Sequence, residues 1–164
     1  MNYSQIIIQD FQQDFSRNST RNIFAGNQTA RCKGCFGCWL KTPGECVMKD
    51  GSEMVGSYIA QTNRVIIASE ILYGGFSIPV KRMLDRSIPC VLPFFKWRNK
   101  RMHHMPRYKN QPSFHIYFYN SHTASEQEKI LAEKVAKAMA INFNCSTCQV
   151  TFLDNQPILE DICQ

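Results

Sequence analysis

Four closely spaced cysteines are the first residues in this sequence that could do chemistry: Cys32, Cys35, Cys38 and Cys46. Two residues separate each of the first three, seven separate the last two, and glycines between them keep the backbone flexible. Four thiolates that converge from a flexible loop can hold an iron–sulfur cluster, so we treat these cysteines as candidate metal ligands. Zinc, redox-active thiols and buried reduced thiols are alternatives that the spacing leaves open.

A glycine turn is the second candidate site, formed by Tyr73, Gly74, Gly75, Phe76 and Ser77. The two glycines let the backbone approach a flat ring closely and adopt positive φ angles. The two aromatic residues offer apolar faces to such a ring. A simple turn from a strand into a helix would also explain the glycines.

Composition limits the class of protein. The chain has 164 residues, of which 44% are hydrophobic and 20% charged, which suits a single domain over residues 1–164 and not a disordered chain. No apolar run is long enough to cross a bilayer and the start lacks a leader, so we expect a cytoplasmic protein with no membrane partner. That compartment keeps thiols reduced, so we expect no set of structural disulfides among the 8 cysteines and weigh metal binding, redox chemistry and burial instead. The net charge of +6 comes without a recognition motif, so we expect no nucleic-acid partner.

Strand and helix patterns alternate along the chain. Apolar runs predict strands at 3–9, 21–25, 64–69, 113–120 and 149–153, and helical spacing predicts helices at 52–62, 79–84 and from 125 onward. Ser52 is a candidate N-cap, and Ser125 with Glu128 forms a capping box. This order predicts an α/β fold with a doubly wound parallel sheet and helices on both faces. Ligands of such sheets bind where the strands end, which gathers residues 9–15, 70–77 and 119–123 around one crevice.

The segment 87–112 is too long for an ordinary connection and holds four large apolar side chains. These are Leu92, Phe94, Phe95 and Trp97. We expect them to bury against another subunit, in a homo-oligomer, or to fold over the crevice.

Three segments carry a family resemblance: Cys32 to Asp50, Tyr73 to Arg86, and Pro93 to Tyr108. Together they resemble the flavodoxin-like NAD(P)H-dependent oxidoreductases, a group that includes NADPH-dependent FMN reductases and iron–sulfur flavoproteins. The resemblance covers about residues 30 to 120. It implies a flavodoxin-like fold, FMN as cofactor, NAD(P)H as co-substrate, and a quinone, a flavin or a protein as electron acceptor.

The resemblance also gives the candidate turn a role. Residues Tyr73 to Ser77 would surround the isoalloxazine ring of FMN, and Tyr119 and Asn120 would form a further flavin loop. The flavin performs the hydride chemistry in such enzymes, so we name no catalytic acid or base.

The start of the chain departs from these relatives. They follow the first strand with a Gly/Ser/Arg/Asn loop for the FMN phosphate, whereas Asp10 and Asp14 follow it here with no glycine between them. Carboxylates repel a phosphate, and bulky residues prevent a nest of backbone N–H groups. With only 31 residues before Cys32, we expect a shortened N-terminal βαβ unit whose phosphate site is rebuilt or lost.

Three hypotheses follow from these observations. The first is an FMN-dependent NAD(P)H oxidoreductase. The second is a flavodoxin-like scaffold that has lost FMN and associates through residues 87–112. The third is a redox carrier whose iron–sulfur cluster is held by Cys32, Cys35, Cys38 and Cys46.

Overall fold

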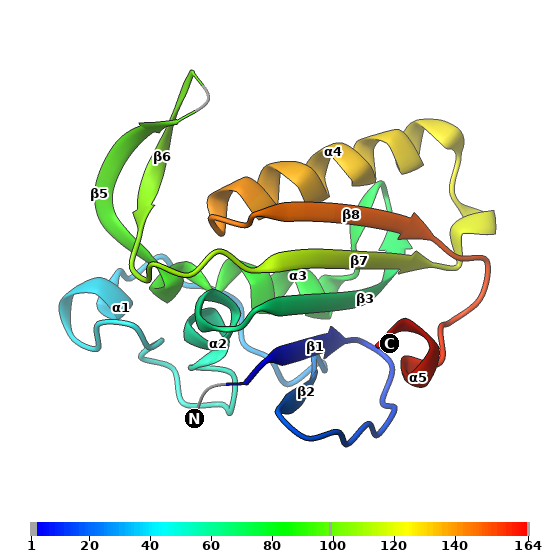
Figure 1. Ribbon diagram of the computed structural model, residues 1–164, viewed down its shortest axis with the longest axis horizontal. Helices are drawn as coiled ribbons and strands as arrows, with labels where there is room; N and C mark the ends of the chain where they lie inside the picture. Colours follow the sequence, from blue (N-terminus) through cyan, green and yellow to red (C-terminus); the bar gives the residue numbers. More distant parts are fainter. Residues whose placement is uncertain (1–2, 99, 164) are drawn as a thin grey trace.

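The computed structural model describes residues 3–98 and 100–163, and its centre is a parallel sheet (Figure 1). The strands lie in the order β2-β1-β3-β7-β8, and the short β4 pairs antiparallel with the end of β3. Their bounds are β1 Gln5–Gln9, β2 Thr20–Phe24, β3 Arg64–Leu72, β4 Gly75–Phe76, β7 Ser113–Tyr119 and β8 Thr147–Phe152. Every predicted strand is present, so the parallel sheet inferred from the alternating pattern is confirmed.

Strand β3 lies at the centre of the sheet. It pairs in parallel with β1 on one side and with β7 on the other. Residues Val65 to Ala68 are completely buried, as expected for a strand covered on both faces. The continuous apolar run therefore predicted both the position and the direction of this strand.

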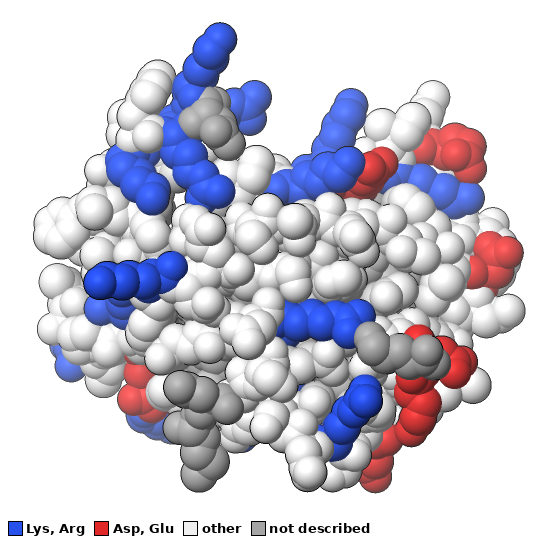
Figure 2. All heavy atoms as spheres, in the orientation of Figure 1, with Lys and Arg blue, Asp and Glu red and all other residues white. Residues whose placement is uncertain are grey.

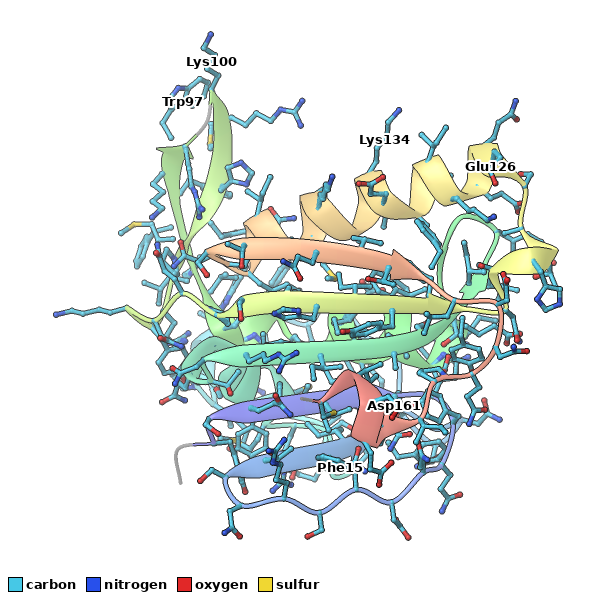
Figure 3. All side chains as sticks on the ribbon, turned by 45° about the vertical axis from the view of Figure 1, so that its right-hand side comes forward. Phe15, Trp97, Lys100, Glu126, Lys134 and Asp161 are labelled. Atoms are coloured by element: carbon cyan, nitrogen blue, oxygen red, sulfur yellow. The ribbon has the colours of Figure 1, made fainter. Side chains whose placement is uncertain are left out.

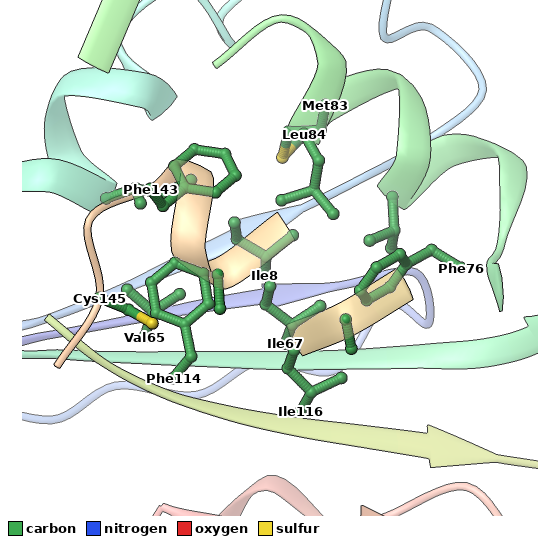
Figure 4. Close-up of a cluster of buried hydrophobic side chains, with 14 of the residues drawn as sticks. Ile8, Val65, Ile67, Phe76, Met83, Leu84, Phe114, Ile116, Phe143 and Cys145 are labelled. Atoms are coloured by element: carbon green, nitrogen blue, oxygen red, sulfur yellow. The ribbon is translucent and has the colours of Figure 1, made fainter. Parts of the chain in front are cut away.

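Three helices cover one face of the sheet: α2 Val55–Gln61, α3 Ile78–Asp85 and α4 Glu126–Asn142. The main hydrophobic core lies between them and the sheet, with Ile8, Ile67 and Phe114 among its fully buried residues (Figure 4). Helix α4 begins with the predicted capping box at Ser125, and α3 has a proline in its first turn. Helix α2 begins later than predicted. Its N-cap is Met54 and not Ser52, whose N–H instead bonds the carboxylate of Asp50.

Among the described residues, the second face carries a single helix, the four-residue α5, Leu159–Ile162. Leu159 and Cys163 pack there on Ile7 and Ile66 of β1 and β3. The link between β1 and β2, residues 10–19, contains no helix, which confirms the shortened N-terminal unit. The outer strand β8 consequently leaves Gln149 and Thr151 exposed on this face.

The segment expected to be a long loop is mostly a β-hairpin. Its strands are β5 Val91–Arg98 and β6 Arg101–Pro106, preceded by the 3₁₀ turn η1 Ile88–Cys90. Proline cannot donate to a ladder, so it is disfavoured within a paired strand. Here Pro93 lies where the pairing register shifts, between Val91 and Phe95, so it breaks no regular pair.

This hairpin stands at the end of the sheet where the strands begin (Figure 1). Arg98 bonds Asn144, and His103 bonds Asn142, which places the hairpin beside the end of α4. Trp97 and Lys100 lie near its tip and point away from the sheet (Figure 3). The prediction that its apolar residues cover the crevice is therefore wrong, because the strands end on the opposite side.

The hairpin exposes Phe94, Phe95 and Trp97 and carries four basic residues. Lys and Arg side chains gather over it, whereas Asp and Glu gather on the opposite side of the molecule, near α5 and the start of α4 (Figure 2). Burial of the exposed aromatic residues against another subunit stays a prediction. Within the described ranges, no helix has the length and apolar character to cross a membrane.

A buried arginine fixes the cysteine segment to α3. The Arg86 side chain is 1% exposed and donates to the carboxylate of Asp50 and to the carbonyl oxygens of Ala30 and Met48. Burial alone would raise the pKa of Asp50, but the hydrogen bonds from Arg86 and from two backbone N–H groups outweigh it and lower the pKa. The ion pair thus closes residues 30–50 onto the end of the helix.

We expect Asp50→Asn to lower the free energy of unfolding at neutral pH by about 3 kcal/mol, because it leaves a buried guanidinium without its partner. The folded-state pKa of Asp50 is lowered, so its contribution is complete above the unfolded value of 3.8 and is lost as the pH falls below it. Urea denaturation at a series of pH values should show the two proteins converging in acid.

Asp85→Asn is the matched control. Asp85 pairs with Lys81 at the surface, where its side chain is 49% exposed. Its removal should change stability by less than about 1 kcal/mol. Equal losses for the two variants would contradict the anchoring role of Asp50.

Candidate functional site

Three strands end together at the predicted crevice, and Asp10 joins them. One carboxylate oxygen accepts the backbone N–H of Glu70 at 3.0 Å, and the other accepts the Tyr119 hydroxyl at 2.9 Å. Asp10 follows β1, Glu70 lies in β3 and Tyr119 ends β7. A carboxylate held by two donors on two neighbouring strands fixes the spacing of this edge.

Tyr119 is a structural donor in this arrangement. Its side chain is buried and its ring meets that of Phe11 edge to face, with centroids 5.4 Å apart. Burial, then the charge and hydrogen bond of Asp10 and the charge of Glu70, raise the pKa of Tyr119 far above its usual range. The hydroxyl therefore stays protonated and keeps donating to Asp10.

Two more carboxylates lie along the same edge. Glu70 accepts the side-chain amide of Asn120 at 2.7 Å, and Asp154 accepts the hydroxyl of Ser121 at 3.1 Å. Asn120 has a φ of 56°, a left-handed conformation that asparagine adopts more readily than most residues. The donors to all these carboxylates are neutral, so the edge retains their negative charge.

The glycine turn closes the hairpin between β3 and β4. Leu72 pairs with Gly75, which leaves Tyr73 and Gly74 as the two turn residues, with φ angles of 50° and 72°. Positive φ at both positions is the type I′ geometry, which favours Asn-Gly. Tyr73 is 85% exposed, so a bulky residue is held in a strained conformation without being buried.

The two glycines of this turn differ in what surrounds them. A Cβ on Gly74 would lie 2.9 Å from Cδ2 of Leu131, so this residue packs against α4. A Cβ on Gly75 would meet nothing closer than the Leu72 oxygen at 3.8 Å. The space beside Gly75 is therefore open to a ligand.

Phe76 and Ser77 point elsewhere than predicted. The ring of Phe76 is buried against Phe118, with centroids 5.0 Å apart, because β4 pairing turns it toward the helix-covered face. Tyr73 is thus the aromatic ring that this turn leaves accessible, which corrects the expectation that both would face a flavin. The Ser77 hydroxyl is buried and has no hydrogen-bond partner among the described residues, so it is not open to a ligand at the turn.

The loop after β1 gives a phosphate little to bind. Its residue Gln13 is tied to the fold, since its carbonyl accepts from Gln9 and Asn22 and its side chain accepts the N–H of Leu159. Within residues 10–19, positive φ occurs only at Ser19, so the loop does not form the alternating backbone that points several N–H groups at one anion. The residues present fit the ring of a flavin but not its phosphate.

Neither a protein-family model nor a curated protein matches this sequence. A solved structure does match: an FMN-dependent NADH-azoreductase from Bacillus anthracis str. Ames Ancestor in complex with FMN. The TM-score is 0.53 at 14% identity, and the match covers 94% of this chain and 88% of the other. The fold is flavodoxin-like. The match and the strand order together confirm the predicted fold class.

The four predicted metal ligands lie away from this edge. Cys32, Cys35, Cys38 and Cys46 line one pocket of about 20 Å³ at the far end of α3, and all are free thiols. Helix α3 separates the pocket from the glycine turn by roughly 12 Å. Among the described residues no group of three or more His, Cys, Asp or Glu side chains is placed to hold a metal, so the iron–sulfur cluster stays a prediction.

A large apolar cavity was not predicted. It has a volume of about 610 Å³ and lies between α3, α4 and the hairpin, with Trp39, Leu84, Phe95, His104, Met139 and Phe143 in its lining. This cavity forms only because residues 91–106 fold into the β5–β6 hairpin, which the sequence does not predict. The bridging role of Asp10 was also missed, although a carboxylate directly after a strand was a usable signal.

The strain at Tyr73 leads to a stability prediction. Tyr73→Asn creates the Asn-Gly pair that type I′ turns prefer, and it removes little buried surface. We expect the free energy of unfolding to rise by about 1 kcal/mol, because asparagine tolerates a left-handed φ better than tyrosine does. Urea denaturation should show a higher midpoint with an unchanged slope.

Tyr73→Phe is the control, because it keeps the strain and should leave stability unchanged. A lower stability for Tyr73→Asn would mean that the tyrosine ring makes a stabilising contact.

Proposed function

We propose that the protein is a flavin-dependent NAD(P)H oxidoreductase that uses FMN and passes electrons to a quinone, a flavin or a protein. The observation that carries this proposal is the strained turn at Tyr73 and Gly74, beside open space at Gly75, at the carboxyl edge of a flavodoxin-like sheet. Strained residues that are not needed for packing are typical of functional sites. The azoreductase with the similar fold is itself FMN-dependent and uses NADH.

Each residue has a distinct role in the proposed site. The exposed Tyr73 ring flanks the isoalloxazine, and the backbone at Gly75 approaches its edge. Asn120 stands on the neighbouring strand end. When bound, FMN supplies the hydride chemistry, so the protein contributes position and exclusion of water, without an acid or a base.

In this proposal the affinity for FMN comes from contacts with the isoalloxazine ring and not from contacts with the phosphate. Asp10, Glu70 and Asp154 add negative charge where the strands end, which opposes a phosphate dianion in a partly buried crevice. FMN should therefore bind no more tightly than riboflavin, which lacks the phosphate.

A scaffold that has lost FMN is the second candidate. The carboxylates at the edge and the exposed aromatic residues of the hairpin favour it. Such a protein would associate through β5 and β6, and it would bind neither flavin.

Replacing Gly75 tests where the ring lies. Gly75→Val fills the open space beside the turn, so it should weaken FMN and riboflavin binding about tenfold or more, equivalent to about 1.4 kcal/mol. Quenching of flavin fluorescence measures the affinity.

The fold itself should tolerate the change, because the added Cβ has no close neighbour and Gly75 does not have a positive φ. Gly74→Ala is the contrast, expected to lower stability through Leu131 and through its positive φ. Unchanged flavin affinity in a folded Gly75→Val protein would show that the ring lies elsewhere.

Comparing two flavins tests the charge at the edge. Asp10→Asn keeps both hydrogen bonds, since its amide oxygen can accept the Glu70 N–H and its amide nitrogen can donate to Tyr119. It removes one negative charge, so the affinity for FMN should rise several-fold while that for riboflavin stays constant. The gain should shrink as salt is added.

Asp14→Asn is the matched control. Asp14 is exposed, so its charge is screened and its loss should have a smaller effect. Binding of FMN far tighter than riboflavin in the wild type, with no response to Asp10→Asn, would contradict the proposed phosphate environment. Binding of neither flavin would support the scaffold.

A further inference from the structure

The pocket lined by the four cysteines holds Cys38 and Cys46 close together, and the flavin proposal gives this pair no role. Cys38 lies in the short helix α1, Gly37–Leu40, and Cys46 lies in the irregular segment that follows the next turn. The backbone N–H of Gly44 bonds the carbonyl of Cys38 at 3.3 Å, which folds the two segments together.

The neighbours of the two cysteines are also in contact. A Cβ on Gly37 would lie 2.5 Å from Cγ1 of Val47, so α1 packs directly on the segment that holds Cys46. All four cysteines line one pocket, and the direct neighbours of Cys38 and Cys46 touch there, so these two cysteines lie on segments packed against each other.

Exposure separates this pair from the other two cysteines. Cys46 is buried and Cys38 is half-buried, whereas Cys32 and Cys35 are exposed. The buried Arg86 side chain lines the same pocket, and its Nε has no hydrogen-bond partner in the described part of the chain.

We propose that Cys38 and Cys46 are a redox-active pair that forms an intramolecular disulfide, independently of any flavin. The oxidant is a low-molecular-weight disulfide such as oxidised glutathione. One thiolate attacks it and releases one small thiol, and the second cysteine sulfur then displaces the other. The protein loses two electrons and two protons to form one S–S bond, and the small disulfide becomes two thiols.

The disulfide would be reported by Trp39, the residue next to Cys38. Its indole N–H bonds the carbonyl of Val91 at 2.9 Å, its ring stacks on Phe36, and it lies 5.2 Å from the ring of His104. A disulfide between Cys38 and Cys46 would shift α1, and the Trp39 indole would shift with it relative to the base of the hairpin.

Peptide mapping tests the pairing on the full-length protein. Reduced protein is equilibrated with reduced and oxidised glutathione, quenched with acid, alkylated and digested with trypsin. Cleavage after Lys33, Lys41 and Lys49 puts Cys38 in peptide 34–41 and Cys46 in peptide 42–49. We expect these peptides to be linked in the wild type and in Cys35→Ser, and unlinked in Cys38→Ser and Cys46→Ser.

Fluorescence gives a second measurement that does not depend on a cysteine variant. The chain has 2 tryptophans, so Trp97→Phe leaves Trp39 as the single emitting tryptophan. The fluorescence of Trp39 should change on oxidation and should return to its initial value when reductant is added. Three results would overturn the proposal: a link that persists in Cys38→Ser, glutathione attached only to Cys32 and Cys35, or iron or zinc that holds the four cysteines in the purified protein.

Discussion

The carboxylate of Asp10 is the constraint on which the rest of this structure depends. By binding Glu70 and Tyr119 it joins the ends of three strands. A chain that builds no phosphate loop can connect β1 to β2 without a helix. The second face of the sheet is then left to α5, whose first N–H bonds Gln13 in that short link.

Much of this fold could be predicted from the sequence, because its strong signals are local. The apolar run after Arg64 gave the central strand, and Ser125 with Glu128 gave the start of α4. The β5–β6 hairpin could not be predicted, since the tolerance of Pro93 depends on a shift in strand register. Helix α5 has four residues, too few for a helical pattern in the sequence, and it is stabilised because the Leu159 side chain is fully buried against the sheet.

The turn at Tyr73 and Gly74 was predictable in position but not in conformation. The glycines located the turn, yet the strain at Tyr73 arises only because β4 pairs with β3. The same pairing sends Phe76 into the core, which no local pattern reveals. The contact of Arg86 with Asp50 likewise joins residues far apart in sequence, and Arg86 lines the pocket of the four cysteines.

Reduction of the bound flavin tests the central claim most directly. Protein loaded with FMN is mixed without oxygen with NADH or NADPH, with or without deuterium on the carbon that transfers hydride. The proposal predicts that the visible flavin absorbance bleaches faster than that of free FMN, and that deuterium slows the bleaching. Bleaching no faster than free FMN, for both nicotinamides, would contradict it.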